Sequence, residues 1–328
     1  MKAATYRKYG PPEVLKIEDV TRPLPKDTEV LVRVRASSVT SGDARIRGFK
    51  DLGIFWLPMR LMLGLLAPRN PVAGMEFAGE IESLGRAVTQ FRACERVFGM
   101  TWLHGANAEY LTIPANALIT TMPDRLTDAE AAAVPFGALS ALVFLRDLGR
   151  VQSGQKILVY GASGCVGVFA VQLAKHFGAE VTGVCSTTNV DIVKSLGADK
   201  VIDYKKEDFS KNGETYDLIF DTVGATSFSR CKRSLTSFGR HLFLTGGLPQ
   251  ILQALWTSTR QGKRVVFGAP SNTRNDLLYI RGLIETGKLR PVIDRTYGLF
   301  EIVEAHRYVD TGRKKGSVVI AVDGQVQR

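Results

Sequence analysis

Residues 157–167 read Ile-Leu-Val-Tyr-Gly-Ala-Ser-Gly-Cys-Val-Gly, and this stretch decides the fold. Residues 157–160 have the apolar character of a buried strand. Three glycines follow, and residues 168–177 then carry the apolar spacing of a helix. A strand, a glycine-rich turn and a helix in this order are typical of a dinucleotide-binding crossover. Such a turn brings the backbone close to a pyrophosphate, and the helix N-terminus offers that anion free N–H groups.

The phosphate loop that this motif predicts covers seven residues. They are Gly161, Ala162, Ser163, Gly164, Cys165, Val166 and Gly167. A side chain at Gly164 or Gly167 would obstruct the phosphate or the contact between helix and strand. Ala162 stands where the usual G-x-G-x-x-G motif has its first glycine, so this chain reads A-x-G-x-x-G.

Length and composition indicate a globular protein of two domains. The chain has 328 residues, of which 45% are hydrophobic and 23% are charged. Its four cysteines lie far apart without paired spacing, which argues against a disulfide framework and for a reducing compartment. The first ten residues lack the apolar core of a secretion signal, so we expect a cytoplasmic protein.

The charge balance is basic, with a net charge of +11. The basic residues are scattered, so we expect them to serve solubility and an anionic cofactor rather than nucleic acid. One apolar run, residues 52–67, is too short to span a bilayer and is interrupted by Pro58 and Arg60. A helix that covers a pocket and a peripheral membrane contact both remain possible for this run.

Two patterns of secondary structure divide the chain. Residues 1–123 alternate short apolar runs with turn signals, as in a distorted β-barrel, with strands expected at 30–36, 76–82 and 108–113. Strands and helices alternate in residues 124–268, which predicts a parallel, doubly wound sheet. The strands of this sheet are expected at 157–160, 180–185, 200–202, 216–221, 241–245 and 264–268, and helices at 127–148, 168–177, 190–196 and 226–235.

The pattern changes again after about residue 269. We expect helices at 275–286 and 300–310 and a last strand at 317–322 that pairs with the first domain. The fold class is therefore α/β, with a doubly wound parallel sheet beside a β-rich domain.

Several ordered motifs resemble one known family. They are residues 70–79 (N-P-V-A-G-M-E-F-A-G), 105–110 (G-A-N-A-E-Y), 131–135 (A-A-A-V-P), 221–224 (D-T-V-G) and 312–320 (G-R-K-K-G-S-V-V-I). Together they resemble the medium-chain dehydrogenase/reductase superfamily, in its zinc-free quinone oxidoreductase (zeta-crystallin-like) branch. The resemblance implies a GroES-like catalytic domain, residues 1–123 completed by 269–328, and a Rossmann dinucleotide-binding domain, residues 124–268. It also implies an active site in the cleft between them.

The resemblance bears on metal use and on the reaction. Zinc-dependent relatives have a cysteine and a histidine at the positions of Thr40 and Met75, and neither of these two residues is a good zinc ligand. We therefore expect no zinc. Without that Lewis acid, hydride delivery to a quinone, an enone or an enal is favoured over the oxidation of simple alcohols.

The cofactor is expected to be NADPH rather than NADH. An acidic residue after the second strand would bind the ribose hydroxyls and repel a 2′-phosphate, but residues 184–189 read V-C-S-T-T-N. Tyr204 matches a tyrosine of similar NADPH reductases, although it can also be a packing residue at a strand end. Thr188 departs from the basic residue of many relatives. Cofactor contacts are expected from Ser140, Ser186, Asn189, Tyr204, Thr245, Gly246 and Phe267, besides residues 161–167.

Three residues are candidates for catalysis. The family's N-x-x-D segment is Thr40-Ser-Gly-Asp43 here, and the Thr40 hydroxyl is suited to bonding the nicotinamide ribose or the substrate. Asp43 either takes part in catalysis or caps the turn that follows it. His104 is either a proton donor or an exposed loop residue, and otherwise solvent or a ribose hydroxyl delivers the proton.

Four residues are candidates for the substrate pocket. Phe55, Trp56 and Met59 either line it or anchor the 50–70 segment to the barrel, and Asn107 replaces an aromatic residue and would make the pocket more polar.

Two other functions stay open: an enoyl-thioester reductase, and a nucleotide-bound RNA-binding or membrane-associated adaptor. A homodimer is expected, since residues 265–267 could pair with their copy across a two-fold axis.

Overall fold

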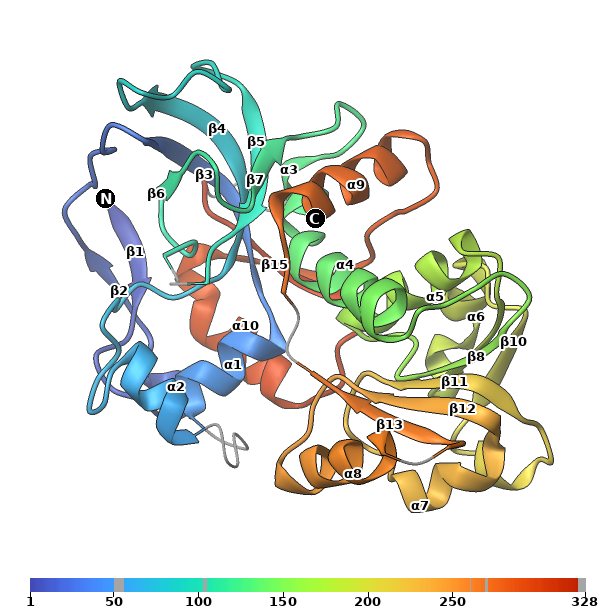
Figure 1. Cartoon of the computed structure of the whole chain (residues 1–328). Helices are drawn as coiled ribbons and strands as arrows, with labels where there is room; N and C mark the ends of the chain where they lie inside the picture. Colours follow the sequence, from blue (N-terminus) through green and yellow to red (C-terminus); the bar gives the residue numbers. More distant parts are fainter. Residues whose placement is uncertain (50–55, 103–104, 260, 269–270, 324–328) are drawn as a thin grey trace. The chain divides into compact units, whose positions relative to one another are not determined.

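The computed structural model describes residues 1–49, 56–102, 105–259, 261–268 and 271–323 (Figure 1). It divides into two compact units. Unit 1 comprises Met1–Phe136, Asn272–Thr286 and Pro291–Arg328, and unit 2 comprises Gly137–Ser271 and Gly287–Arg290. The first boundary between the compact units lies after residue 136, whereas the sequence pattern changes at 124. The boundary lies later because helix α3 (Asp128–Ala132) packs on strands of unit 1.

Unit 1 is built on a seven-stranded sheet. Its strands are β3 (Glu29–Val39), β4 (Glu76–Leu84), β5 (Arg96–Met100), β6 (Tyr110–Pro114), β7 (Ile119–Thr121), β14 (Ile293–Gly298) and β15 (Ser317–Ala321). The order is β14-β15-β3-β4-β5-β7, and β6 pairs with β3. Strands β1 (Lys2–Thr5) and β2 (Lys16–Asp19) form a separate antiparallel pair. The last strand, β15, pairs antiparallel with β3, which confirms the predicted return of the C-terminus.

The core of unit 1 follows from alternation along these strands. Val30, Val32 and Val34 of β3 are buried on one face, as are Val318 and Ile320 of β15, because successive side chains of a strand point to opposite faces. The helices around this core are α1 (Ser41–Gly48), α2 (Trp56–Leu63), α3, α9 (Arg274–Glu285) and α10 (Ile302–Asp310).

Unit 2 is a parallel six-stranded sheet. The strands are β8 (Lys156–Tyr160), β9 (Glu180–Cys185), β10 (Lys200–Asp203), β11 (Tyr216–Asp221), β12 (Leu235–Phe243) and β13 (Arg264–Phe267). Their order is β10-β9-β8-β11-β12-β13, so the order reverses between β8 and β11. This is the strand order of a Rossmann fold, whose ligands bind at the carboxyl ends of the strands beside that reversal.

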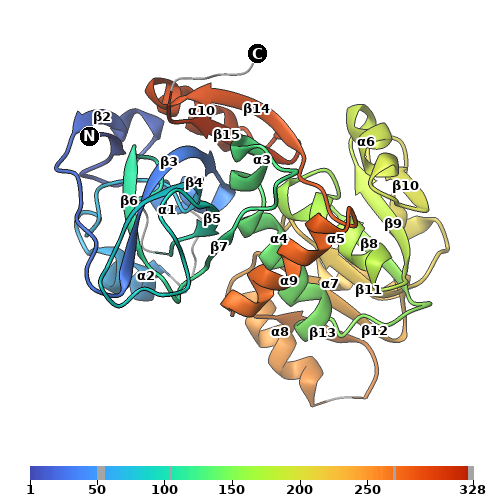
Figure 2. The ribbon, with the colours of Figure 1, turned by 90° about the horizontal axis from the view of Figure 1, so that it is seen from above.

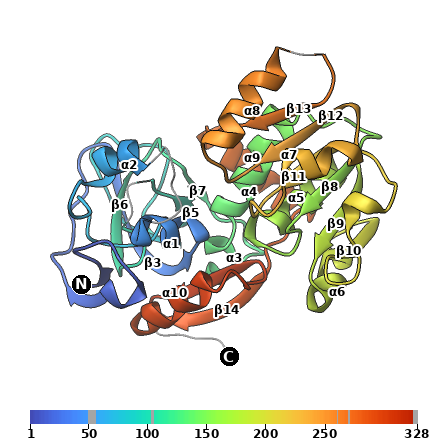
Figure 3. The same cartoon turned by 90° about the horizontal axis from the view of Figure 1, so that it is seen from below.

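The helices of unit 2 connect the strands. They are α5 (Cys165–His176), α6 (Val190–Ser195), α7 (Phe228–Cys231) and α8 (Leu248–Ser258). Helix α4 (Pro135–Leu142), whose first two residues belong to unit 1, and a π-helical turn at Val143–Leu148 precede the first strand. Helix α6 lies beside β9 and β10 in two views (Figures 2 and 3). No helix within the described ranges is long and apolar enough to cross a membrane.

The structure corrects several details of the sequence prediction. The helix expected over 127–148 is broken into α3, α4 and the π-helical turn, because Pro135 cannot continue the helix before it. The capping box of Thr127 and Glu130 is present as predicted. Strand β12 begins at Leu235, six residues before the predicted start, so α7 is short. Helix α8 was not predicted.

Candidate functional site

The loop after β8 in unit 2 has room only for glycine at two positions. Gly161 has a φ of +82°, which L side chains rarely adopt, and a Cβ there would lie 2.6 Å from the Thr222 Oγ1. A Cβ on Gly167 would lie 2.1 Å from the Gly161 carbonyl oxygen, far inside van der Waals contact. A Cβ on Gly164 would lie 3.4 Å from that same oxygen, so the chain itself leaves space there. Gly161 and Gly167 thus hold the turn tight, whereas a side chain at Gly164 would not clash with the chain itself.

Ala162 replaces a motif glycine without strain. Ala162 does not adopt the left-handed conformation, which Gly161 takes instead. Its side chain is fully buried, and an added Cβ on Gly183 of β9 would lie 3.1 Å from the Ala162 Cβ. The missing side chain of Gly183 therefore makes the space that Ala162 occupies.

Helix α5 begins within this loop, at Cys165. Gly164 is its N-cap and supplies no side-chain hydrogen bond to the first turn. The first N–H groups of a helix have no partner within the helix, and together with the helix dipole they favour an anion. The loop and the start of α5 can therefore receive the pyrophosphate of a dinucleotide.

Residues after β9 and β10 lie close to the loop. The Asn189 Nδ2 donates to the Ser163 Oγ at 2.9 Å, and both side chains are buried. The backbone N–H of Tyr204 donates to the Cys185 carbonyl at 3.1 Å, which places Tyr204 beside the end of β9, with its ring half exposed. The structure thus brings together four predicted cofactor residues, Ser163, Ser186, Asn189 and Tyr204, at the carboxyl edge of the sheet.

A carboxylate also lies at this edge, although it was not predicted. Asp203 ends β10 and accepts a hydrogen bond from the Thr187 Oγ1 at 2.7 Å. That bond, with the backbone N–H of Lys205, holds the pKa of Asp203 below its usual value. Lys205 and Lys206 follow in sequence, so the carboxylate stands among positive charges.

The turn after β11 is held by one buried carboxylate. Asp221 accepts hydrogen bonds from the backbone N–H groups of Val223, Gly224 and Thr226 at 2.8–3.0 Å and from the Thr226 Oγ1 at 2.6 Å. The same hydroxyl lies 3.0 Å from the His241 Nε2. Burial lowers the pKa of His241 to about 4, so this ring is neutral near pH 7.

This turn supports the phosphate loop, because the Thr222 Oγ1 donates to the Tyr160 carbonyl at 2.9 Å. The D-T-V-G motif therefore has a structural role, because it holds the turn after β11 against the end of β8.

The remaining predicted cofactor residues of unit 2 lie at the ends of β12 and β13 or on α4. A Cβ on Gly246 would lie 2.9 Å from the Phe267 Cε2, and one on Gly224 would lie 2.5 Å from the Thr245 Oγ1. Thr245, Gly246 and Phe267 thus pack near the D-T-V-G turn. Ser140 is buried on α4, 4% exposed.

In unit 1, Thr40 and Asp43 form the capping box of α1. The Thr40 Oγ1 accepts from the Asp43 N–H at 3.0 Å, and the Thr40 N–H and Oγ1 donate to the Asp43 Oδ2 at 2.8 and 2.6 Å. Both residues are buried. This geometry supports the second of the two roles predicted for Asp43, that of a helix cap.

A buried glutamate joins two elements next to this cap. Glu76 at the start of β4 accepts hydrogen bonds from the Ser38 hydroxyl and, at 2.6 Å, from the backbone N–H of Phe136. Its side chain is fully buried. Burial raises the pKa of Glu76 to about 7, although the two hydrogen bonds and the charge of Lys314 act against this, while the charge of Asp43 adds to it.

The two positions that hold zinc ligands in other branches lie side by side. A Cβ on Gly42 would lie 2.8 Å from the Met75 Cε and 3.2 Å from the Thr40 Oγ1. A thioether and a hydroxyl already bonded to Asp43 are a poor donor set for zinc. Among the residues that the structure describes, no group of three His, Cys, Asp or Glu side chains is placed to hold a metal ion.

The predicted substrate residues have different surroundings. Asn107 is fully buried in unit 1, and its Oδ1 accepts from the Ser37 hydroxyl at 2.8 Å. Trp56 is 44% exposed and Met59 is half-buried on α2. Phe55 and His104 lie outside the described residues.

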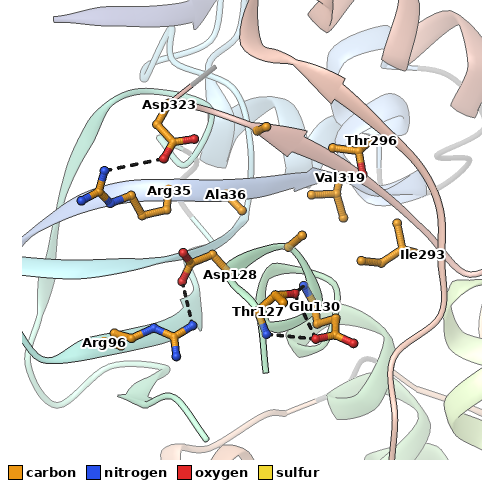
Figure 4. Close-up of a pocket in the computed structure, with 12 residues that line it drawn as sticks. Arg35, Ala36, Arg96, Thr127, Asp128, Glu130, Ile293, Thr296, Val319 and Asp323 are labelled. Carbon is orange, nitrogen blue, oxygen red and sulfur yellow. Dashed lines mark hydrogen bonds and ion pairs between the residues drawn. The ribbon is translucent and has the colours of Figure 1, made fainter. Parts of the chain in front are cut away.

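A cavity of about 540 Å³ lies elsewhere in unit 1 (Figure 4). Its charged side chains are directed at one another: Arg35 lies 3.6 Å from Asp323, and Arg96 lies 3.1 Å from Asp128. The residues that line it include none of the predicted site residues. These two ion pairs, and the hydrogen bonds that Glu130 accepts from Thr127, occupy its charged groups, so we assign it no ligand.

The fold and loop define a class: a GroES-like domain combined with a Rossmann domain that binds a pyridine nucleotide. Residues 26–124 match the family model "Alcohol dehydrogenase GroES-like domain", and residues 196–320 match "Zinc-binding dehydrogenase".

Full-length relatives narrow this class. The 2-methylene-furan-3-one reductase of Solanum lycopersicum is 32% identical over 335 residues, which cover 98% of this chain and 79% of the relative. A mitochondrial NAD(P)H oxidoreductase of Homo sapiens is 29% identical over 357 residues, which cover 98% of this chain and 89% of the relative. The structure of the quinone oxidoreductase from Coxiella burnetii superposes with a TM-score of 0.85 at 28% identity, covering 98% and 99% of the two chains.

The chain belongs to the medium-chain dehydrogenase/reductase superfamily, in its quinone oxidoreductase-like branch. It is an NAD(P)H-dependent reductase of the quinone oxidoreductase or enone reductase type. The recognition made from the ordered motifs is thereby confirmed.

Proposed function

We propose that this chain is an NADPH-dependent, zinc-independent reductase that transfers hydride to a quinone or an α,β-unsaturated carbonyl compound. The observation that carries the proposal is the tight loop of residues 161–167, which contains the N-terminus of α5, where no side chain caps the helix. The coenzyme supplies the hydride when it is bound. The chain binds the pyrophosphate, orients the coenzyme through Ser140, Thr245, Gly246 and Phe267, and excludes water.

The preference for NADPH rests on the edge formed by β9 and β10. The residues directly after β9, Ser186 to Asn189, carry no acidic side chain to repel a 2′-phosphate. Ser186 and Tyr204 lie at this edge, and Lys205 adds positive charge. The carboxylate of Asp203 opposes the preference, but its bond to the Thr187 hydroxyl turns it toward that residue. We therefore propose Ser186, Asn189, Tyr204 and Lys205 as the 2′-phosphate site.

Independence from zinc rests on the donor set at Thr40 and Met75. We propose that Asp43 is a cap, that Thr40 positions α1, and that the proton comes from solvent, a ribose hydroxyl or His104. The names of two relatives, a 2-methylene-furan-3-one reductase and a quinone oxidoreductase, support conjugated acceptors as substrates.

The test is turnover with a panel of acceptors. Oxidation of NADPH is followed by absorbance with a benzoquinone, a naphthoquinone, an enone, an enal and a crotonyl thioester, each repeated with NADH and with zinc chelated. We expect turnover with a quinone or an enone, higher kcat/KM with NADPH, and no effect of the chelator. Turnover with the thioester alone would transfer the assignment to an enoyl-thioester reductase. Binding of NADPH without turnover of any acceptor would contradict the reductase assignment.

We also propose a homodimer formed through β13, the last strand of the sheet in unit 2. Such an edge strand offers unpaired backbone groups to a second copy. Light scattering on the eluted protein measures the mass, and replacement of Val266 by proline is expected to convert a dimer to a monomer.

A further inference from the structure

A short helix and the turn after it leave many apolar side chains in water. We call residues 56–66, which comprise α2 and this turn, the apolar hairpin. The exposed fractions are 44% for Trp56, 54% for Leu57, 58% for Leu61, 54% for Met62, 55% for Leu65 and 87% for Leu66. Contiguous apolar side chains exposed on this scale mark an interaction surface.

Several contacts hold the apolar hairpin on unit 1, and Leu63 of α2 is buried. The Arg60 guanidinium lies 4.1 Å from the ring centres of Tyr9 and Phe49 and 5.2 Å from that of Trp56. The Tyr9 hydroxyl donates to the Gly64 carbonyl at 2.9 Å. These contacts fix the helix and the turn while the apolar side chains face outward, so the surface is preformed. Figures 1 and 3 both show α2 at the margin of unit 1.

The charged residues within and directly after the apolar hairpin are basic. No acidic residue occurs between positions 52 and 75, whereas Arg60 and the exposed Arg69 lie within this stretch. The Arg69 Nη2 donates to the Leu61 carbonyl at 2.9 Å, which places its charge beside the exposed leucine. Lys8, next to Tyr9, is exposed as well. The whole chain carries a net charge of +11.

These charges distinguish the candidate partners. A second copy of the chain would bring the same positive charges against each other. A nucleic acid would neutralise the charge but leave the apolar side chains in water. An anionic lipid surface satisfies both features, because acyl chains receive the leucines and headgroups attract the arginines.

We propose that the apolar hairpin docks the protein on an anionic membrane surface. The helix lies in the interface and does not span the bilayer. Trp56 sits at headgroup level, where amphipathic rings are favoured, and Leu65 and Leu66 insert at the tip of the turn.

Vesicle sedimentation tests this proposal. The full chain is mixed with vesicles of phosphatidylcholine, with or without one-third phosphatidylserine, at low and high salt. We expect sedimentation with the anionic vesicles that weakens at high salt. The double change Leu65→Glu and Leu66→Glu is expected to weaken partitioning at least about tenfold, since burial of one leucine is worth about that much or more. Arg69→Gln is expected to weaken it about fivefold on anionic vesicles only.

A matched control separates docking from general loss of apolar surface. Leu24, also in unit 1, is 83% exposed, so Leu24→Glu removes a comparable side chain away from the apolar hairpin. Its partitioning is expected to stay within about twofold of the original, and all variants are expected to keep their melting temperature and NADPH affinity.

Three results would overturn the proposal. The first is equal sedimentation of the double variant and the unchanged protein, or sedimentation of neither. The second is a change in particle mass for the double variant without vesicle binding, which would assign the surface to a second copy. The third is an RNA gel shift that Arg69→Gln abolishes, again without vesicle binding.

Discussion

Replacement of Glu76 by glutamine should change how stability depends on pH. Glu76 is fully buried, and its pKa is raised to about 7 from a usual value of 4.5. Between these two values the folded chain holds a proton that the unfolded chain has released. Stability therefore falls as pH rises through this window, and the loss is complete above the folded pKa. Each unit of difference corresponds to about 1.4 kcal/mol, so the loss between about pH 5 and about pH 8 is about 2 kcal/mol.

Glu76→Gln removes this loss and keeps both contacts, because an amide can accept from the Phe136 N–H and donate to the Ser38 hydroxyl. Urea unfolding at about pH 5 and about pH 8, followed by circular dichroism, measures the free energy of unfolding of both proteins. The variant should gain about 2 kcal/mol relative to the unchanged protein as the pH rises. Glu82→Gln is the control on the same strand, since Glu82 pairs with Arg22 at the surface. Plotted against pH, the stability of this variant should run parallel to that of the unchanged protein. If the stability of Glu76→Gln also runs parallel to that of the unchanged protein across this pH range, the folded chain does not hold a proton on Glu76.

Three further predictions concern glycine and the coenzyme. Gly167→Ala should lower stability by about 1–3 kcal/mol and abolish coenzyme binding, because the Cβ would meet the Gly161 carbonyl at 2.1 Å. Gly164→Ala should keep its melting temperature and weaken NADPH binding at least about tenfold. Thermal melting measures the change in stability, and calorimetry measures the change in binding. Gly282→Ala, within α9 and with nothing within 4 Å of its Cβ, should raise stability by about 0.5–1 kcal/mol in the same melting assay. Ser186→Asp should lower kcat/KM for NADPH but not for NADH, and an equal loss for both would disagree with a 2′-phosphate site after β9.

Most of unit 2 could be predicted because its signals are local. Strands β9 and β11 have the predicted bounds, since buried parallel strands are continuous apolar runs between turn residues. Helix α6 ends where predicted, near Gly197, whose φ is +98°. Helix α8 was missed although Leu248, Leu252 and Leu255 have helical spacing, because its N-cap is Gly247, which offers no side chain as a start signal.

The polar sites were harder to predict because they depend on contacts distant in sequence. Glu76 was noticed only as part of a motif, and its raised pKa depends on burial among residues as far away as Phe136. Asp221 likewise belonged to a motif, whereas its four hydrogen bonds emerge only when the turn is folded. The capping box of Thr40 and Asp43 had a local signal, a threonine followed three residues later by an acid, and the sequence left it open beside catalysis.

The central claim is that NADPH docks on residues 161–167 at the start of α5. Calorimetric titration of the purified chain with NADPH tests it most directly, with Gly164→Ala titrated in parallel. We expect one NADPH bound per chain and at least about tenfold weaker binding by the variant. No heat of binding with either NADPH or NADH, or the same affinity in the variant and the unchanged protein, would contradict it.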